Sequence, residues 1–217
     1  MIRKWFFPCL LLLLSGLLSC SDDGTVKKDY WVNGNLKSEL RYDGEQLDGV
    51  CTWYFPNGSP QMEVNYSKNK MDGLSRRWYE NGKLMEEKWY KNGVQDSLYR
   101  FYTVKGLLDT EAYYVDGKLN GDYHRWFENG QSFQEGQFVD DMMDGSWMIF
   151  YPDGSLAAKA DFDKGTGTQT SYAQSGYKCL MTPYVDNVKH GREIYYNPDG
   201  TVTRVAVYED GDWIRDE

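Results

Sequence analysis

The chain has 217 residues, of which 16% are aromatic, and it carries 33 acidic against 24 basic side chains, a formal net charge of −9. This excess of negative charge opposes binding to nucleic acid and to anionic lipid surfaces. The many tyrosines, tryptophans and glycines favour strands and tight turns over helices.

The first residues predict an export signal. Arg3 and Lys4 precede an apolar run over residues 5–18, which is short for a membrane span of ~20 residues. The run ends in Leu-Leu-Ser-Cys, which resembles a bacterial lipobox, so residues 1–19 are expected to be a lipoprotein signal peptide and Cys20 the lipidated residue. An ordinary signal peptide with a chance cysteine is the alternative.

Residues 20–26 are then expected to form a lipidated tether. Its Ser-Asp-Asp at 21–23 resembles the acidic export tag of some bacterial surface lipoproteins, and a plain flexible tether is the alternative. We therefore expect a protein of the cell envelope, anchored in the outer membrane, in the periplasm or exposed at the surface. Removing the signal peptide leaves 22 basic and 33 acidic residues, a net charge of −11.

The remaining residues, 27–217, repeat themselves. Turn glycines recur every 24 residues, with one gap of 22, and an aromatic residue lies four positions before and eight positions after each glycine. The glycines are Gly34, Gly58, Gly82, Gly106, Gly130, Gly154, Gly176 and Gly200. The earlier aromatics run from Tyr30 to Tyr196 and the later ones from Tyr42 to Tyr208. Asn-Gly and Asp-Gly pairs supply tight turns, so the pattern predicts eight β-hairpins in a repeat array.

Two details of each hairpin can be predicted from the columns. In the second strand, offsets +2, +4, +6 and +8 from the turn glycine are apolar or small, which predicts one packed face. The aromatic columns are expected to pack as core, with sugar stacking as the alternative. A second glycine column, from Gly49 to Gly191, is expected to form the other turn of each unit. The aspartates before it, Asp48, Asp72, Asp96 and Asp144, suit turns better than calcium, which needs about six to eight converging oxygens.

The recurring block G-x-x-x-x-[WY]-[YF]-x-N-G-x-L-x-x-E-x-x-[YF] resembles the MORN repeat, in the variant found in bacterial proteins. Residues 73–90 fit it throughout, and residues 49–66 depart only at Pro60. The resemblance implies an all-β fold, an elongated twisted single sheet or open groove of hairpins. Cys51 and Cys179 lie five units apart, roughly 48 Å at ~4.8 Å per strand, so no intramolecular disulfide is expected.

A glutamate column lies five residues after the turn glycines, at Glu39, Glu63, Glu87, Glu111 and Glu135. Five equivalent carboxylates do not form the differently perturbed pair that a hydrolase needs. The column is therefore a structural feature of the repeat or a partner-binding face for a cationic protein. Only His124 and His190 are histidines, and no metal, cofactor or catalytic motif is found, so we expect a protein that is not an enzyme.

The unit from Gly167 to Tyr184 is two residues short and has Met181 in place of the glutamate. It is either a drifted repeat or a local irregularity that shapes a partner site. For the whole chain, we expect a lipid-anchored envelope protein that acts as a protein-binding or scaffolding module. The family resemblance implies a second hypothesis, an antitoxin or immunity protein that neutralises a toxin partner. The third hypothesis is a glycan-binding surface lipoprotein, which requires polysaccharide binding that is lost when Trp53 or Trp89 is mutated.

Overall fold

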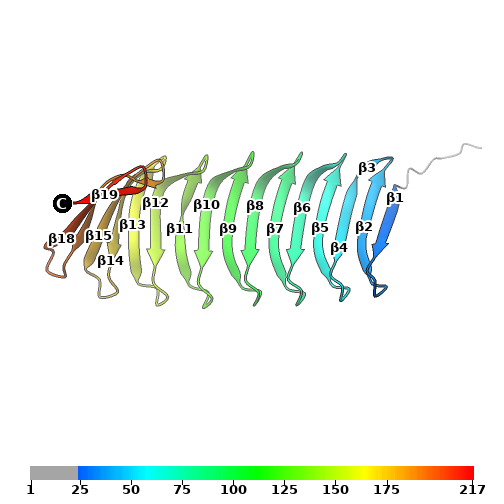
Figure 1. The fold of residues 1–217 in the computed structure, drawn as a ribbon, viewed down its shortest axis with the longest axis horizontal. Helices are drawn as coiled ribbons and strands as arrows, with labels where there is room; N and C mark the ends of the chain where they lie inside the picture. The colour runs from blue at the N-terminus through cyan, green and yellow to red at the C-terminus, as the bar shows by residue number, and fades with distance from the viewer. Residues whose placement is uncertain (1–23) are drawn as a thin grey trace, which may run out of the picture.

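The computed structural model describes residues 24–217, and the predicted signal peptide and Cys20 lie outside them. In the described part the chain forms 19 β-strands and no helix. Successive strands pair antiparallel, except that the two-residue strands β3 (Gln46–Leu47) and β16 (Val188–Lys189) each share a partner with the strand that follows. The hairpins therefore form one long open sheet (Figure 1). The predicted all-β hairpin array is confirmed. No helix long and apolar enough to cross a membrane is present in residues 24–217.

The strands follow chain order. They are β1 (Thr25–Tyr30), β2 (Leu36–Asp43), β3 (Gln46–Leu47), β4 (Gly49–Tyr54), β5 (Pro60–Ser67), β6 (Lys70–Trp78), β7 (Leu84–Lys91), β8 (Val94–Tyr102), β9 (Leu108–Val115) and β10 (Lys118–Trp126). They continue as β11 (Ser132–Val139), β12 (Met142–Phe150), β13 (Leu156–Asp163), β14 (Thr166–Tyr172), β15 (Lys178–Val185), β16 (Val188–Lys189), β17 (Gly191–Tyr196), β18 (Val202–Glu209) and β19 (Asp212–Asp216).

The predicted Asn-Gly turns close the hairpins at one edge of the array. In the turn between β4 and β5, the Phe55 amide donates to the Ser59 carbonyl, and the Gly58 amide donates to the Phe55 carbonyl. The turn asparagine also joins neighbouring units. Asn81 Nδ2 donates to the Val104 carbonyl at 3.0 Å, 23 residues further on, and Asn129 makes the same bond to Pro152. Each such asparagine therefore shapes its own turn and fastens the next one.

The second glycine column does not form the other turns, contrary to the prediction. The other turns lie at pairs such as Lys68-Asn69 and Asn92-Gly93, in which both residues have positive φ. Glycines of the second column lie within strands instead. Gly73, with φ +102°, belongs to β6, where three residues bulge out opposite Asn65. The aspartates beside these glycines still serve turns, because Asp144 accepts a bond from the Lys164 amide in the next unit.

Beside each turn glycine, from Gly34 to Gly200, a one-residue bulge changes which face a side chain occupies. The shift recurs in all eight hairpins, and in β6–β7 it pairs Trp78 with Leu84 but Arg77 with Glu86. The residue two positions after the turn glycine, such as Leu84, therefore lies on the same face of the sheet as the glutamate at +5. It does not lie on the face of the aromatic residue at +8. The prediction that the residues at +2, +4, +6 and +8 share one packed face was therefore wrong for the residue at +2. A bulge inserts one extra residue into a strand, which a strict period of two cannot accommodate.

The two faces differ in burial. We call the side that carries Tyr66 and Tyr114 the tyrosine face, and the side that carries the glutamate column the glutamate face. Of the twelve buried side chains in residues 24–217, eleven, including Phe162, lie on the tyrosine face, and only Val205 lies on the glutamate face. Trp147, Ala160 and Phe162 form its best-packed cluster. Small residues make room for rings as predicted, since a Cβ on Gly136 would collide with the Trp147 indole.

The two aromatic columns lie on opposite faces. The +8 column, including Phe138 and Tyr184, packs around the cluster on the tyrosine face. The earlier column lies on the glutamate face, where Tyr102 Oη lies 3.4 Å from Glu87 and the His124 ring stacks on Trp126 at 4.1 Å. The prediction that both columns form the core therefore holds only for the +8 column.

The short unit lacks the bulge of the second glycine column. From β13 to β14 the pairing runs without interruption, with Phe162 opposite Gly167, and Gly167 has no positive φ. The two missing residues are thus the bulge itself. In Figure 1 the strands after β13 tilt and crowd together, whereas the earlier hairpins are evenly spaced. Asn187 bridges this region, since its side chain accepts from the Met143 amide and donates to the Asp141 carbonyl.

Candidate functional site: the glutamate face

The glutamates lie in register across the sheet, with a basic side chain between neighbouring glutamates except Glu39 and Glu63, which have Thr52 between them. Strand pairing places Arg76 between Glu63 and Glu87, and Arg100 between Glu87 and Glu111. We call this line across the sheet, from Lys28 to Glu135, the ion-pair row. Its ion pairs are Lys28–Glu39 at 2.9 Å, Arg76–Glu63 at 3.7 Å, Arg76–Glu87 at 3.1 Å, Arg100–Glu111 at 2.7 Å and His124–Glu135 at 3.6 Å.

The ion-pair row changes the electrostatics expected for this face. The hydrogen bond from Arg100 to Glu111 raises the pKa of the guanidinium, although burial acts against it. Partly exposed pairs of this kind contribute about 0–1 kcal/mol each, so they order the face more than they stabilise the fold. The five glutamates therefore form a mixed-charge row and not a purely acidic stripe. Their role as a partner-binding face stays a prediction.

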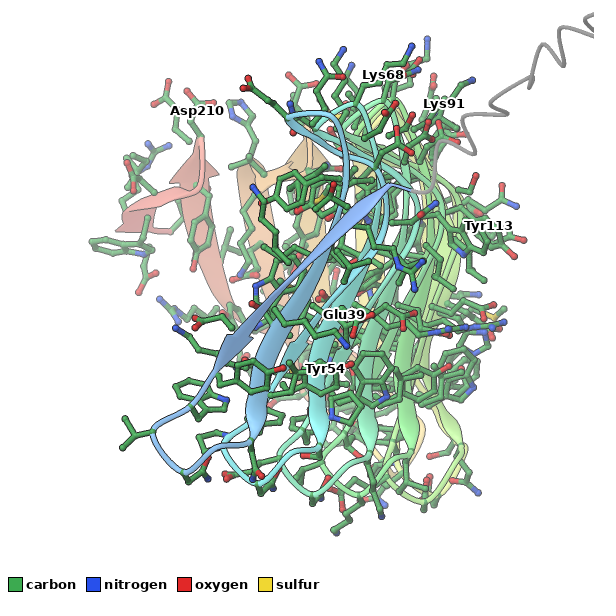
Figure 2. The ribbon with its side chains drawn as sticks, turned by 90° about the vertical axis from the view of Figure 1, so that its right-hand side faces the viewer. Glu39, Tyr54, Lys68, Lys91, Tyr113 and Asp210 are labelled. Carbon is green, nitrogen blue, oxygen red and sulfur yellow. The ribbon has the colours of Figure 1, made fainter. Side chains whose placement is uncertain are left out.

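The row ends abruptly after Glu135. The next positions across the sheet carry no alternation of charge; they are Met148, Lys159, Thr170, Met181, Ile194 and Val205. Figure 2 shows the array from its N-terminal end, with Glu39 near the middle of the strands and Tyr54 nearer the Asn-Gly turns. The charged part of the glutamate face thus belongs to β1–β11.

An apolar group borders the ion-pair row on the side away from the Asn-Gly turns. Leu74 is paired with Trp89, and Leu98 with Tyr113, on the same face. The Trp89 and Tyr113 side chains are 42% and 40% exposed. We call these four residues the apolar patch. Trp53 pairs with Met62 and lies on the tyrosine face, so the two tryptophans of the glycan hypothesis do not share a surface.

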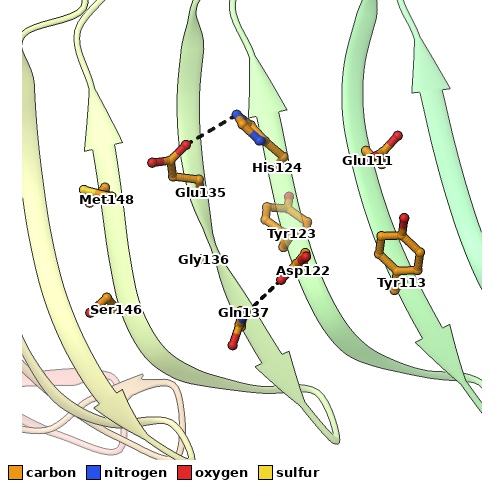
Figure 3. A pocket seen from close by; sticks show the side chains of 10 residues that line it. All are labelled: Glu111, Tyr113, Asp122, Tyr123, His124, Glu135, Gly136, Gln137, Ser146 and Met148. Carbon is orange, nitrogen blue, oxygen red and sulfur yellow. Dashed lines mark hydrogen bonds and ion pairs between the residues drawn. The ribbon is translucent and has the colours of Figure 1, made fainter.

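A depression of about 490 Å³ lies at the C-terminal end of the ion-pair row (Figure 3). Its walls include Tyr113 from the apolar patch, Glu111, Asp122 and Glu135, with Met148 on the far side. Asp122 accepts a hydrogen bond from Gln137 at 2.8 Å. The depression is open to solvent and contains more acidic than basic side chains.

His124 and Glu135 line this depression and lie close to Ser132, but the three residues do not form a catalytic triad. His124 Nε2 lies 2.9 Å from Ser132 Oγ and 3.6 Å from Glu135. A triad needs the carboxylate on the other ring nitrogen, Nδ1, where it orients the imidazole. Among residues 24–217 no three histidine, cysteine or carboxylate side chains are grouped as metal ligands. Cys51 in β4 and Cys179 in β15 are both free thiols.

The structural interpretation of the glutamate column includes pairing with neighbouring lysines or arginines, but these basic residues were not identified from the sequence. A signal for them exists, because each lies eleven residues before its glutamate: Lys28 before Glu39, Arg76 before Glu87 and Arg100 before Glu111. This spacing is the length of the hairpin that joins two paired positions. It becomes informative only when the strand register is known.

Two comparisons bear on the family of the chain. A family model described as MORN repeat variant matches residues 47–68, 71–93 and 143–164. The first segment begins at the last residue of β3 and covers β4 and β5, the second covers β6 and β7 apart from Lys70, and the third covers β12 and β13 apart from Met142. No curated protein matches the chain in sequence.

Proposed function

Because the chain contains MORN repeats of the variant type, we propose that it is a binding module that presents its glutamate face to another protein. MORN repeats are consistent with a protein-binding or scaffolding role. The observation that carries the proposal is the exposed apolar patch beside the ion-pair row. Tryptophan, tyrosine and arginine are the residues that contribute most at protein interfaces, and this face offers all three.

The shape of the molecule supports the same function. An open sheet of hairpins offers an extended surface in place of an enclosed cleft, which suits a partner that contacts several repeats. The side chains on this surface are held at fixed spacing by strand pairing, so little order has to be gained on binding. The protein acts without catalysing a reaction.

The proposal includes a lipid anchor. Cys20 becomes the lipidated residue after removal of residues 1–19, and residues 20–26 tether the array to the outer membrane. This part rests on the sequence alone. Labelling cells with a radioactive fatty acid tests it: the wild-type chain incorporates the label and fractionates with membranes, and Cys20→Ser does neither. Label retained by Cys20→Ser would overturn the anchor.

Site-specific photo-crosslinking in native cells tests the binding face. A photoreactive residue at Trp89 on the glutamate face is expected to capture a partner protein. The same residue at Arg77, which is exposed on the tyrosine face, is the matched control and is expected to capture far less. Equal capture from both faces, or no protein adduct from Trp89, would contradict the proposal. A captured toxin would identify an immunity function, and a captured polysaccharide would identify glycan binding.

A further inference from the structure

The ion-pair row has a gap that its own repeats make visible. Glu87 lies between Arg76 and Arg100, one on each neighbouring strand. Glu135 occupies the same position two units later, yet its neighbours across the sheet are His124 and Met148. An imidazole and a thioether thus stand where Glu87 has two guanidinium groups, and Glu63 and Glu111 each have one arginine neighbour.

The gap coincides with the depression at the end of the row (Figure 3). Arginine is longer than histidine, and the shorter ring at position 124 leaves space above the sheet. Glu135 keeps only weak contacts, at 3.4 Å from Ser132 Oγ and 3.6 Å from His124 Nε2. No lysine or arginine nitrogen of residues 24–217 approaches Glu135 within the 4.0 Å of an ion pair. The Glu135 side chain is 34% exposed and lines the depression.

The walls of the depression match one kind of side chain. Tyr113 offers a ring and Met148 an apolar side chain on opposite sides, and Asp122 adds a second carboxylate. A guanidinium forms paired hydrogen bonds with carboxylates and stacks on aromatic rings, while its aliphatic stem packs on apolar groups. Lysine carries a compact charge and lacks the paired geometry.

We infer that this depression receives an arginine side chain of the partner protein, which completes the ion-pair row beside Glu135. The inference rests on the proposed function and adds the chemistry of the partner. The neighbouring apolar patch, with Leu98 next to Tyr113, receives an apolar residue adjacent to that arginine. Arg76 and Arg100 show within the same molecule how such a side chain sits between two glutamates of this face.

Peptide binding to the full lipidated chain in detergent tests the inference. A displayed library of random seven-residue peptides is selected on the wild-type chain, and arginine with an apolar neighbour is expected to be enriched. The best peptide is then compared with a copy that carries citrulline in place of arginine. Citrulline has nearly the same shape without the charge, and about tenfold weaker binding is expected. Peptides that lack arginine, or equal binding of the citrulline copy, would overturn the inference.

Two variants of the chain fill the gap from within. Met148→Arg and His124→Arg place a guanidinium beside Glu135, as in the earlier units, and are expected to keep the fold and weaken the arginine peptide at least about tenfold. Thr170→Arg, two strands further along the same line, is the matched control and is expected to leave binding unchanged. Circular dichroism and thermal unfolding confirm folding. Unchanged binding to both filled variants would overturn the inference.

The two proposals fail in different ways. If Trp89 crosslinks a protein in cells and the capture is unaffected by Met148→Arg and by Glu135→Gln, the binding face stands and the arginine inference falls. If no protein is captured in cells, the proposed function falls, and the peptide experiment still decides whether the depression selects arginine. A peptide that binds through lysine as tightly as through arginine also contradicts the inference.

Discussion

Buried Glu193 forms an ion pair with the partly exposed Lys189 near the C-terminal end of the array, with 2.6 Å between Nζ and Oε1. The Glu193 side chain is fully buried on the tyrosine face and also accepts hydrogen bonds from Thr182 at 2.9 Å and Tyr195 at 2.8 Å. In other units this position holds Cys51, Ser75 or Tyr99, none of which is charged at neutral pH. This carboxylate therefore fastens β15, β16 and β17 together.

Replacing Glu193 by alanine is expected to lower the free energy of unfolding by about 2–4 kcal/mol. The loss leaves the Thr182 and Tyr195 hydroxyls without their acceptor and Lys189 without its partner, although Lys189 can reach water. Because each repeat contacts only its neighbours, hydrogen exchange should rise in β15–β18 and stay unchanged in β4–β9. Glu39→Ala, which breaks an exposed pair, is the control at under about 1 kcal/mol. Uniform loss of protection would contradict this localisation.

Gly136→Ala is expected to destabilise the array by about 1–3 kcal/mol. The new methyl group would collide with the Trp147 indole, which is 4% exposed and cannot move aside. The neighbouring unit suggests the rescue, because Ala112 there lies opposite Tyr123 without conflict. The double variant Gly136→Ala with Trp147→Tyr should recover part of the lost stability in thermal unfolding. If the double variant loses more free energy of unfolding than the two single variants lose together, the packing argument is contradicted.

Hairpins could be predicted from the sequence because their signals are local. Asn81 and Gly82 are adjacent, and the aromatics Trp78 and Tyr90 lie within one unit. The face of each side chain could not be predicted in the same way. Leu84 changes face because a bulge forms when β6 pairs with β7, and this extra residue depends on contacts between strands.

The candidate site was predictable only in part for the same reason. Glu87 stands out as a column member, but Arg76 becomes its partner only when two strands are aligned. The depression exists because this repeat has His124 at the position where two earlier units have an arginine. Such an absence gains meaning once Arg76 and Arg100 are known to occupy one line across the sheet.

Ser97→Gly is expected to stabilise the array by about 0.5–1 kcal/mol. Ser97 has φ +66° at the bulge where the units on either side have Gly73 and Gly121. A side chain in this left-handed region is strained, and glycine relieves the strain. The exposed hydrogen bond from Ser97 Oγ to Asp96 offsets only a small part of the gain. Chemical denaturation of both proteins measures the difference.

The converse change provides the control. Gly121→Ser introduces the same strain, and its Cβ would lie 3.2 Å from the Tyr113 Cβ. It should therefore destabilise by more than Ser97→Gly stabilises. A destabilised Ser97→Gly variant would show that the serine hydrogen bond outweighs the backbone strain.

Asp153 makes the stability of the array sensitive to acid. Its carboxylate accepts bonds from the Ser155 hydroxyl, the Gln174 amide and the Ser155 backbone amide, which lower its pKa from 3.8 to about 2. A depressed pKa means that the folded state favours the charged form, so this contribution is present above about pH 4 and disappears as the pH falls through about 2. Asp153→Asn, which restores the residue found at Asn57 and Asn129, cannot be protonated in this range.

Urea unfolding at pH 7, 4, 3 and 2 checks this effect. The wild-type chain should lose stability relative to Asp153→Asn only as the pH falls from about 4 to about 2, and the difference should be constant from pH 7 to about 5. Asp161→Asn is a suitable control because it changes a neighbouring exposed carboxylate while keeping the same net charge as the Asp153 variant. Equal acid dependence of all three proteins would contradict the role of Asp153, since the remaining carboxylates would then account for the acid response.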